Sequence, residues 1–428
     1  MTGADNKAVP SGDGRTYASV TAAYWAFTLT DGALRMLVLL HFHQLGFTPL
    51  DIASLFLLYE AMGVITNFLG GWIGARFGLR ITLFAGLAVQ IAALLMLSAM
   101  DPAWTVFFSV GYVMVAQALS GVAKDLTKMS SKSAVKLVVA SEEDGLLFRW
   151  VAVLTGSKNA LKGVGFLLGG VMLEGLGFTH ALYAMAGMLA VVLAAALLTI
   201  KADLGRSKSK IGKRDLFAKT REINFLSAAR IFLFASRDVW FVVGVPIFLY
   251  DQLSWSFDRV GLFMAVWVVG YGIVQALVPR FLRRTRDAGT AARSAVFWGG
   301  VLALLPALIA AGLTPGWMPA GFGAGDAPAI ILVGGLLLFG VVFAVNSALH
   351  SYLIVAYSDA DKVALNVGFY YMANAVGRFA GTLLSGLIYQ LAGLMATLWV
   401  SAAMVLLAVV LTLPLRAPSR DRAAVTQT

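Results

Sequence analysis

The sequence predicts an all-α membrane protein with twelve transmembrane helices, arranged as two pseudo-symmetric six-helix bundles. Three observations predict this fold: an apolar composition, apolar blocks long enough to span a bilayer, and an internal repeat that relates the two halves. Of the 428 residues, 59% are hydrophobic and only 13% are charged, and the mean hydropathy is +0.82. A soluble domain of this length has too little interior to bury so many apolar side chains, so the chain belongs in a membrane.

Twelve apolar blocks of 20 or more residues recur along the chain. At a rise of about 1.5 Å per residue, each block is long enough to cross a hydrocarbon core of ~30 Å as an α-helix. The predicted spans are residues 17–44, 50–75, 79–100, 104–126, 147–175, 180–200, 223–250, 258–282, 294–313, 328–356, 365–391 and 394–415. They divide the chain into an N-terminal tail (1–16), a first bundle (17–200), a basic linker (201–222), a second bundle (223–415) and a C-terminal tail (416–428).

Lys and Arg gather in alternate predicted loops, whereas the intervening loops hold almost none apart from Arg259. This is the positive-inside pattern, and it predicts that both termini and the linker lie in the cytoplasm. Because topology already accounts for the net charge of +11, we expect no nucleic-acid partner. Short tails and helices rich in Ala, Gly and Leu favour a bacterial inner membrane. The basic loops contain Arg76 and Arg80; Lys128, Lys132 and Lys136; Lys201, Arg206, Lys208, Lys210, Lys213 and Arg214; Arg283, Arg284 and Arg286; and Lys362.

The two predicted bundles resemble each other in sequence, as expected for a carrier built from repeats. A shift of 216 residues places Lys162 on Arg378, and a shift of 207 residues places Asp31 on Asp238. Leu and Gly coincide easily by chance in apolar helices, but charged residues at the centres of apolar blocks do not. The 216-residue shift also superposes Gly165 on Gly381, Leu167 on Leu383, Leu168 on Leu384, Gly170 on Gly386 and Gly177 on Gly393.

Charged residues near the middle of the apolar blocks predict the function. A charge at this depth costs about 2.5 to 3.5 kcal/mol on insertion scales, so such residues normally face a bundle interior and mark a solute path. The basic residues are Arg35, Lys158, Lys162, Arg230, Arg237 and Arg378, and the acidic ones are Asp31, Glu60 and Asp238. The surplus of about three positive charges favours a multiply charged anion as the ligand. The sequence therefore predicts a membrane carrier for such an anion.

Two pairs of these residues have helical spacing. Lys158 and Lys162 lie one turn apart on one face, where like charges repel, and an anionic substrate, a neighbouring acid or deprotonation of one lysine would offset the repulsion. Asp31 and Arg35 also lie four residues apart and are expected to pair on one face of the first span. That pair is either part of the site or a structural ion pair that fixes helix geometry.

The second bundle contributes three arginines to the predicted site. Arg230 and Arg237 lie seven residues apart on one side of the seventh span, and guanidinium forks suit the binding of oxyanions. Arg378, related to Lys162 by the repeat, is expected to complete a clamp for an anion with two charged ends. Asn374 and Asn159 are further candidates for substrate contacts, and Asp31, Glu60 and Asp238 are candidates for proton coupling.

No arrangement of residues typical of an enzyme is found in the sequence. It contains no Ser-His-Asp, paired-carboxylate or His-Glu-x-x-His pattern, so we expect neither catalysis nor a cofactor. His41 and His43 are two residues apart and point to different sides of a helix, and cysteine is absent, so no metal site is expected.

Two sets of residues carry a resemblance to known families. The segment 71–80, Gly-Trp-Ile-Gly-Ala-Arg-Phe-Gly-Leu-Arg, resembles the Gly-x-x-x-Asp-Arg-x-Gly-x-Arg loop of the major facilitator superfamily, with Ala75 in place of the usual Asp. Within that superfamily, four charged blocks resemble the ArsJ family of organoarsenical efflux permeases, and the likeness extends over nearly all twelve spans. These blocks are YWAFTLTDGALR (24–35), ALSGVAKDLTKM (118–129), TGSKNALKGVG (155–165) and SRDVWFVV (236–243).

The resemblance implies export of 1-arseno-3-phosphoglycerate, and hence resistance to arsenate. A glyceraldehyde-3-phosphate dehydrogenase makes this unstable ester when arsenate replaces phosphate, so the resemblance also implies a functional partnership with that enzyme. The expected fold is that of the major facilitator superfamily, working by alternating access in the lipid bilayer. Export of another organophosphate, organic anion or drug by a carrier of the same fold remains the alternative.

Overall fold

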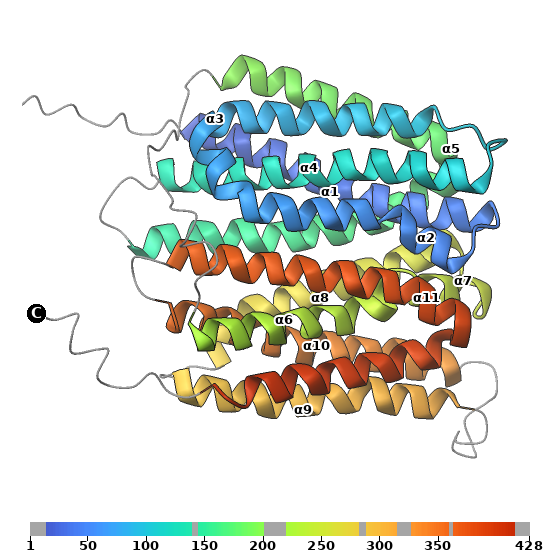
Figure 1. Cartoon of the computed structure of the whole chain (residues 1–428). Helices are drawn as coiled ribbons and strands as arrows, with labels where there is room; N and C mark the ends of the chain where they lie inside the picture. The colour runs from blue at the N-terminus through green and yellow to red at the C-terminus, as the bar shows by residue number, and fades with distance from the viewer. Residues whose placement is uncertain are drawn as a thin grey trace, which may run out of the picture.

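The computed structural model of the chain describes residues 14–138, 144–200, 220–281, 288–314, 327–358 and 363–415, and its regular elements there are all α-helices, as predicted. The helices run side by side along a common direction (Figure 1). They are α1 (Gly14–Gln44), α2 (Pro49–Leu55), α3 (Leu57–Ser98), α4 (Val106–Val138), α5 (Asp144–Thr199), α6 (Arg221–Phe241), α7 (Gly244–Asp251), α8 (Phe257–Phe281), α9 (Ala288–Leu313), α10 (Ala327–Ala356) and α11 (Val363–Thr412).

Within the described ranges, nine helical stretches are long and apolar enough to cross a membrane. Two of them, Ser157–Thr199 with 43 residues and Asn366–Thr412 with 47, would be about twice the bilayer thickness if they were straight. Each is broken by one glycine, Gly177 with φ 72° or Gly393 with φ 73°, in the left-handed region that favours glycine. Gly78 breaks α3 in the same way. These breaks let one long helix supply two segments, while the count of twelve spans remains a prediction.

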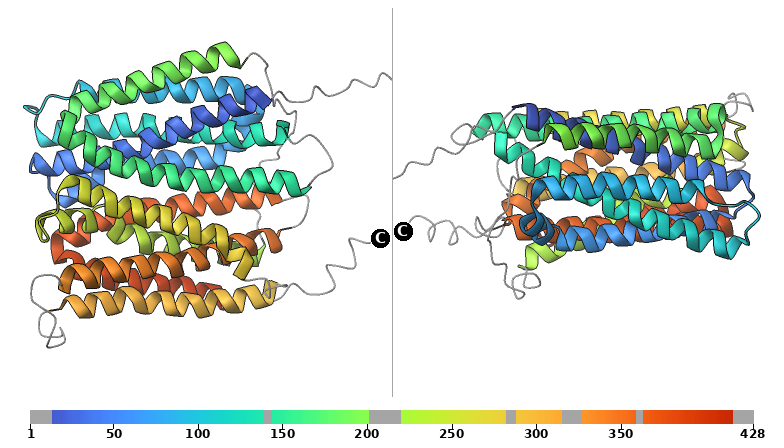
Figure 2. Two further views of the ribbon diagram at one scale, coloured as in Figure 1. Left: turned by 180° about the vertical axis from the view of Figure 1, so that it is seen from behind. Right: turned by 90° about the horizontal axis from the view of Figure 1, so that it is seen from above.

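The two halves of the chain form two side-by-side groups of helices. Helices α1 to α5, blue to green, lie at the top of Figure 1, and α6 to α11, green-yellow to red, lie below them. The view from behind in Figure 2 shows the same division. The groups meet where α5 packs on α8 and where α11 packs on α2 and α3. Most of the predicted linker (201–222) and of both tails lies outside the described residues.

Glycines bring neighbouring helices into backbone contact, and the repeat relates these contacts. A methyl group at Gly165 of α5 would overlap the carbonyl oxygen of Leu29 of α1. At the related position, a methyl group at Gly381 of α11 would come within 2.9 Å of the Ala235 carbonyl oxygen of α6. Close approach through small residues is the usual way in which membrane helices pack. The repeat therefore places α1 and α6 in equivalent positions of the two halves.

Replacement of Gly165 by Ala should lower stability by about 1 to 3 kcal/mol, because the new methyl group meets only backbone atoms, which cannot move aside. Thermal unfolding of the detergent-solubilised protein measures this loss. Gly187→Ala in the same helix is the matched control, since nothing lies within 4 Å of its added methyl group. Equal melting temperatures for the two variants would contradict the assigned packing.

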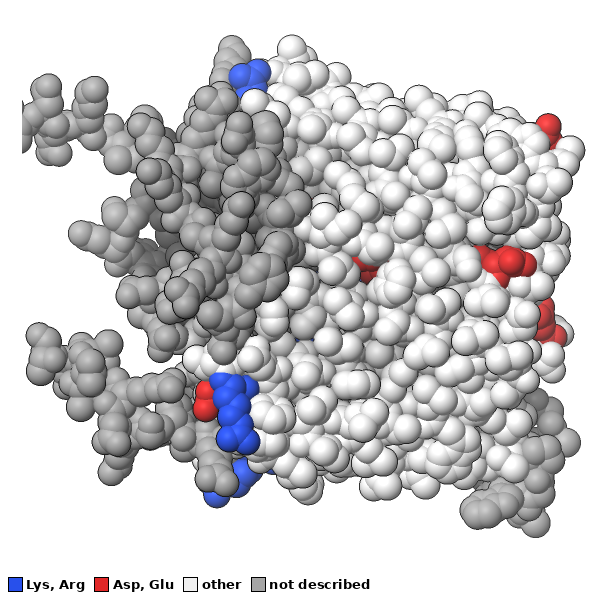
Figure 3. Space-filling model, viewed as in Figure 1, with Lys and Arg blue, Asp and Glu red and all other residues white. Residues whose placement is uncertain are grey.

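On the face shown in Figure 3, charged side chains gather at the two ends of the molecule. The visible Lys and Arg side chains gather at the end opposite α2 and α7, whereas most visible acidic side chains lie at the end formed by α2 and α7 (Figure 3). We call the latter the α2/α7 end. The predicted topology places the basic end in the cytoplasm.

Candidate functional site

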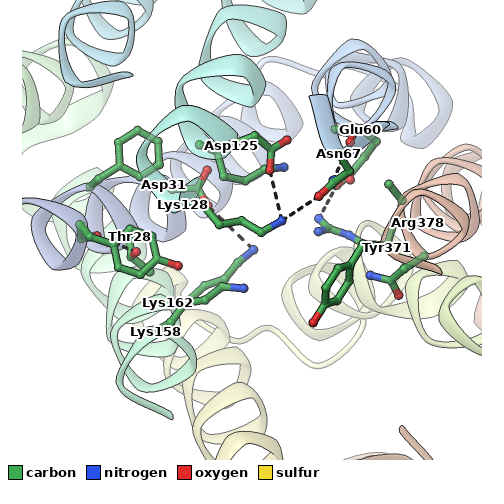
Figure 4. A pocket seen from close by; sticks show the side chains of 16 residues that line it. Thr28, Asp31, Glu60, Asn67, Asp125, Lys128, Lys158, Lys162, Tyr371 and Arg378 are labelled. Atoms are coloured by element: carbon green, nitrogen blue, oxygen red, sulfur yellow. Dashed lines mark hydrogen bonds and ion pairs between the residues drawn. The ribbon is translucent and has the colours of Figure 1, made fainter. Parts of the chain in front are cut away.

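A cavity of about 200 Å³ lies between the two halves of the molecule. Helices α1, α3, α4 and α5 supply its lining from the first half, and α11 supplies it from the second half (Figure 4). Its charged side chains are five basic and three acidic ones, a formal excess of two positive charges where the sequence predicted about three. They are Lys124, Lys128, Lys158, Lys162 and Arg378, with Asp31, Glu60 and Asp125.

The structure brings about half of the predicted site residues into this cavity. Of the eight predicted substrate-binding residues, the four that line it are Lys158, Lys162, Asn374 and Arg378. Of the three predicted acids, the two that line it are Asp31 and Glu60. The predicted residues outside its lining are Arg35, Asn159, Arg230, Arg237 and Asp238.

Glu60 is the central acid of the site, and its side chain is only 1% exposed. Its Oε1 atom accepts hydrogen bonds from Arg35 Nη2 at 2.9 Å and from Arg378 Nη2 at 2.6 Å. Because Arg35 lies on α1 and Arg378 on α11, one carboxylate oxygen ties the two halves together. The expected pairing of Asp31 with Arg35 is therefore wrong: Asp31 accepts a hydrogen bond from the Tyr59 hydroxyl at 2.6 Å instead.

Two ion pairs occupy equivalent places in the two halves. Lys162 Nζ lies 3.9 Å from Asp31 Oδ2, and Arg378 Nε lies 3.6 Å from Asp238 Oδ2. The shift of 216 residues relates the two basic members, and the shift of 207 residues relates the two acidic ones. Both pairs are long, and Arg378 Nε makes no hydrogen bond.

The contribution of α4 to the cavity was not predicted. Lys128 was expected in a cytoplasmic loop, but α4 continues to Val138, beyond the predicted end at residue 126, and Lys128 lines the cavity. Lys128 Nζ donates to Asn67 Oδ1 at 2.9 Å and contacts Asp125 Oδ1 at 3.4 Å (Figure 4). Lys124 stands four residues before it on the same face. Lys158 and Lys162 of α5 have the same four-residue spacing, so the sequence already indicated that Lys124 and Lys128 share a helix face.

Aromatic rings support several of these cations. Lys124 Nζ lies 3.9 Å from the centre of the Tyr59 ring, and Lys128 Nζ lies 5.6 Å from the Tyr371 ring. Cation–π contacts therefore help to stabilise these two ammonium groups in the cavity lining.

Two of the predicted residues outside the cavity make other contacts. Arg237 Nε donates to Asp238 Oδ1 at 2.6 Å, and its guanidinium lies 5.0 Å from the centre of the Phe234 ring. Asn159 packs against Gly272 of α8, where an added methyl group would lie 2.8 Å from Asn159 Cβ. Arg237 and Arg378 therefore share Asp238 as an acidic partner. Asn159 lies in the contact between the two halves.

The halves are also joined at the α2/α7 end. His43 Nε2 lies 2.8 Å from Asp251 Oδ1, and the Leu50 amide donates to Gln390 Oε1 at 3.0 Å. Gly386 lies against the Pro49 carbonyl with no room for a side chain. These contacts hold the two halves together at this end of the cavity. In the part of the chain that the structure describes, no group of three or more His, Cys, Asp or Glu is placed to hold a metal ion.

Comparison with known proteins relates the sequence to one family and its fold to solved structures. The family model described as Major Facilitator Superfamily matches residues 19–325. A crystal structure of a POT family transporter in complex with a thioalcohol-conjugated peptide has a TM-score of 0.70 and 14% identity, covering 94% of this chain and 95% of that one. The nucleoside transporter NupG has a TM-score of 0.69 and 15% identity, covering 93% and 98%. Comparison with curated protein sequences gives no match.

Proposed function

The chain belongs to the major facilitator superfamily, and on that premise we propose that it exports an organoarsenical anion, 1-arseno-3-phosphoglycerate, by alternating access. Family and fold make it a membrane transporter. The observation that supports an anionic substrate is the excess of basic side chains in the cavity between the halves. The choice of ester rests on the charged blocks that resemble the ArsJ family.

The chemistry of this ester suits the cavity. It carries a phosphate at one end and an arsenate at the other, each with a charge of roughly −1.5 to −2 if arsenate behaves like phosphate. Pentavalent arsenic presents hard oxygen atoms, which ammonium and guanidinium donors bind well without thiolates. Lys158 and Lys162 offer such donors from the first half, and Arg378 and Asn374 face them from the second. An ordinary phosphate ester presents nearly the same hydrogen-bonding surface and is the second candidate substrate.

The proposed cellular setting follows from the charge pattern and the substrate. We place the protein in the bacterial inner membrane with both termini in the cytoplasm, where a glyceraldehyde-3-phosphate dehydrogenase supplies the ester. In this orientation the α2/α7 end is extracellular, and its contacts His43–Asp251 and Leu50–Gln390 close the described conformation to the outside. A cytoplasmic substrate would bind to this state.

Uptake of arsenate into everted vesicles tests the proposal. Uptake should require the dehydrogenase, glyceraldehyde 3-phosphate and the oxidised nicotinamide cofactor together, because free arsenate has only one of the two charged ends. Vesicles without the protein are the control, and arsenite should not be taken up because it is neutral at pH 7. Arsenate uptake without the three components would show a plain oxyanion carrier. No arsenic uptake, together with uptake of phosphoglycerates, would favour the phosphate-ester alternative.

A further inference from the structure

Arg230 is a deeply buried arginine outside the cavity lining, and its side chain lies in the second half of the molecule. Only 4% of Arg230 is exposed, and Nη1 donates to the Ser347 carbonyl at 3.3 Å and to Ser347 Oγ at 3.1 Å. Its Nε atom makes no hydrogen bond, and no carboxylate of the described residues lies within 4.0 Å of it. By contrast, Arg237 and Arg378 of the same half both contact Asp238. A buried charge without a counter-ion is costly, so this position favours an anion.

Two aromatic rings flank the Arg230 guanidinium. They are Phe234 at 4.0 Å and Tyr370 at 4.7 Å, measured from Cζ to the ring centres. Ser347 and His350 lie one turn apart on α10 and therefore share a face. His350 is 2% exposed, and its Nδ1 atom makes no hydrogen bond. Buried polar atoms normally have partners, so the unbonded Arg230 Nε–H indicates a missing acceptor, and His350 Nδ1 lacks a partner in the same neighbourhood.

The position of this neighbourhood relates it to the cavity. Tyr370 lies beside Tyr371, which lines the cavity, and precedes Arg378 by eight residues on α11. Eight residues of α-helix correspond to roughly 12 Å along the axis. The neighbourhood of Arg230 therefore lies roughly this far from Arg378 along α11.

We propose that Arg230, Ser347 and His350 form a second anion subsite, which takes one charged end of a two-headed substrate while the cavity lysines and Arg378 take the other. The ligand class is a phosphate, arsenate or carboxylate group on a short carbon chain. This inference rests on the proposed function only for the two-headed nature of the substrate. It does not depend on arsenic.

Binding to the purified, detergent-solubilised protein tests the subsite, with 3-phosphoglycerate as the two-headed probe and inorganic phosphate as the one-headed probe. The unmodified protein should bind 3-phosphoglycerate at least about tenfold more tightly than phosphate, because a second charged group gains its own charge-assisted hydrogen bonds. Arg230→Gln should remove most of this preference, and Arg230→Lys should retain part of it. Arg293→Gln, at an exposed arginine of the same half, should leave the preference unchanged. A preference that survives in Arg230→Gln overturns the proposal.

A second variant keeps the test decisive if Arg230→Gln does not fold. His350→Gln keeps Arg230 and its buried charge, and it should weaken 3-phosphoglycerate binding several-fold. Unchanged binding in this variant overturns the subsite. Everted vesicles separate the two proposals. Arsenic uptake that needs the dehydrogenase and persists in Arg230→Gln refutes the subsite alone. Absence of arsenic uptake, with binding of 3-phosphoglycerate that depends on Arg230, supports the subsite and refutes the proposed substrate.

Discussion

Replacement of Arg378 by Gln is expected to abolish transport and to leave the protein folded. The variant leaves neither neighbouring acid without a basic partner. Glu60 keeps its hydrogen bond to Arg35 at 2.9 Å, and Asp238 keeps its hydrogen bond to Arg237 at 2.6 Å. The cavity, however, loses the only cation that the second half contributes to its described lining. Hydrogen bonds to charged groups contribute about 1.5 to 3 kcal/mol each, so loss of even one should weaken binding tenfold or more.

Uptake into everted vesicles measures the transport activity, and thermal unfolding of the same preparation measures the fold. Arg293→Gln, an exposed arginine of the same half, is the matched control and should behave as the unmodified protein does. Arg378→Lys keeps the charge but loses the guanidinium fork, so its activity should lie between that of Arg378→Gln and that of the unmodified protein. Normal uptake by Arg378→Gln would mean that the anion binds elsewhere.

Replacement of Glu60 by Gln should have the opposite effect, because it damages the fold itself. One oxygen of Glu60 serves both Arg35 and Arg378, and the carboxylate is 1% exposed. Without it, Arg35 has no acidic partner in the described part of the chain, and Arg378 retains only Asp238 at 3.6 Å. Removing one partner of a buried ion pair costs about 3 to 5 kcal/mol. We therefore expect poor expression and a lower melting temperature.

A second substitution distinguishes a stranded charge from general damage. Adding Arg35→Gln to Glu60→Gln removes the stranded arginine and should restore part of the lost stability, as a double-mutant cycle would show. Glu174→Gln, at an exposed glutamate of α5, is the matched control. Wild-type stability of Glu60→Gln, or no recovery in the double variant, would contradict the role of Glu60 as the shared counter-ion.

The fold was more predictable than the site, because its signals are local in the sequence. Apolar blocks, alternating charged loops and the matched shifts of Lys162 with Arg378 and of Asp31 with Asp238 can be read without coordinates. The pairing of charges cannot be read in this way. Arg35 has the right spacing to reach Asp31, but it bonds to Glu60, 25 residues away, because the rotation of each helix about its axis decides which side chains meet.

The length of a helix beyond its apolar block was a second source of error. Hydropathy falls at Lys124, so the predicted span ended at residue 126 and Lys128 was assigned to a loop. In the structure α4 continues, and Lys128 bonds to Asn67 inside the cavity. Arg237, predicted to bind substrate, lies outside the cavity lining, where it contacts Asp238 and the Phe234 ring. In both cases a partner on another helix or beside the residue decides its place, and apolar periodicity carries no information about that partner.

The hydrogen bond between Glu60 and Arg378 affects how easily the two halves can separate during transport. It crosses from one half to the other, so an empty carrier must break a buried charge-assisted contact of 2.6 Å before its halves can separate at this depth. A bound anion can take the place of Glu60 on Arg378, and Glu60 then still has Arg35. If the proposed anion replaces Glu60 on Arg378, loading lowers the cost of separating the halves. The unloaded carrier would then change conformation more slowly than the loaded one.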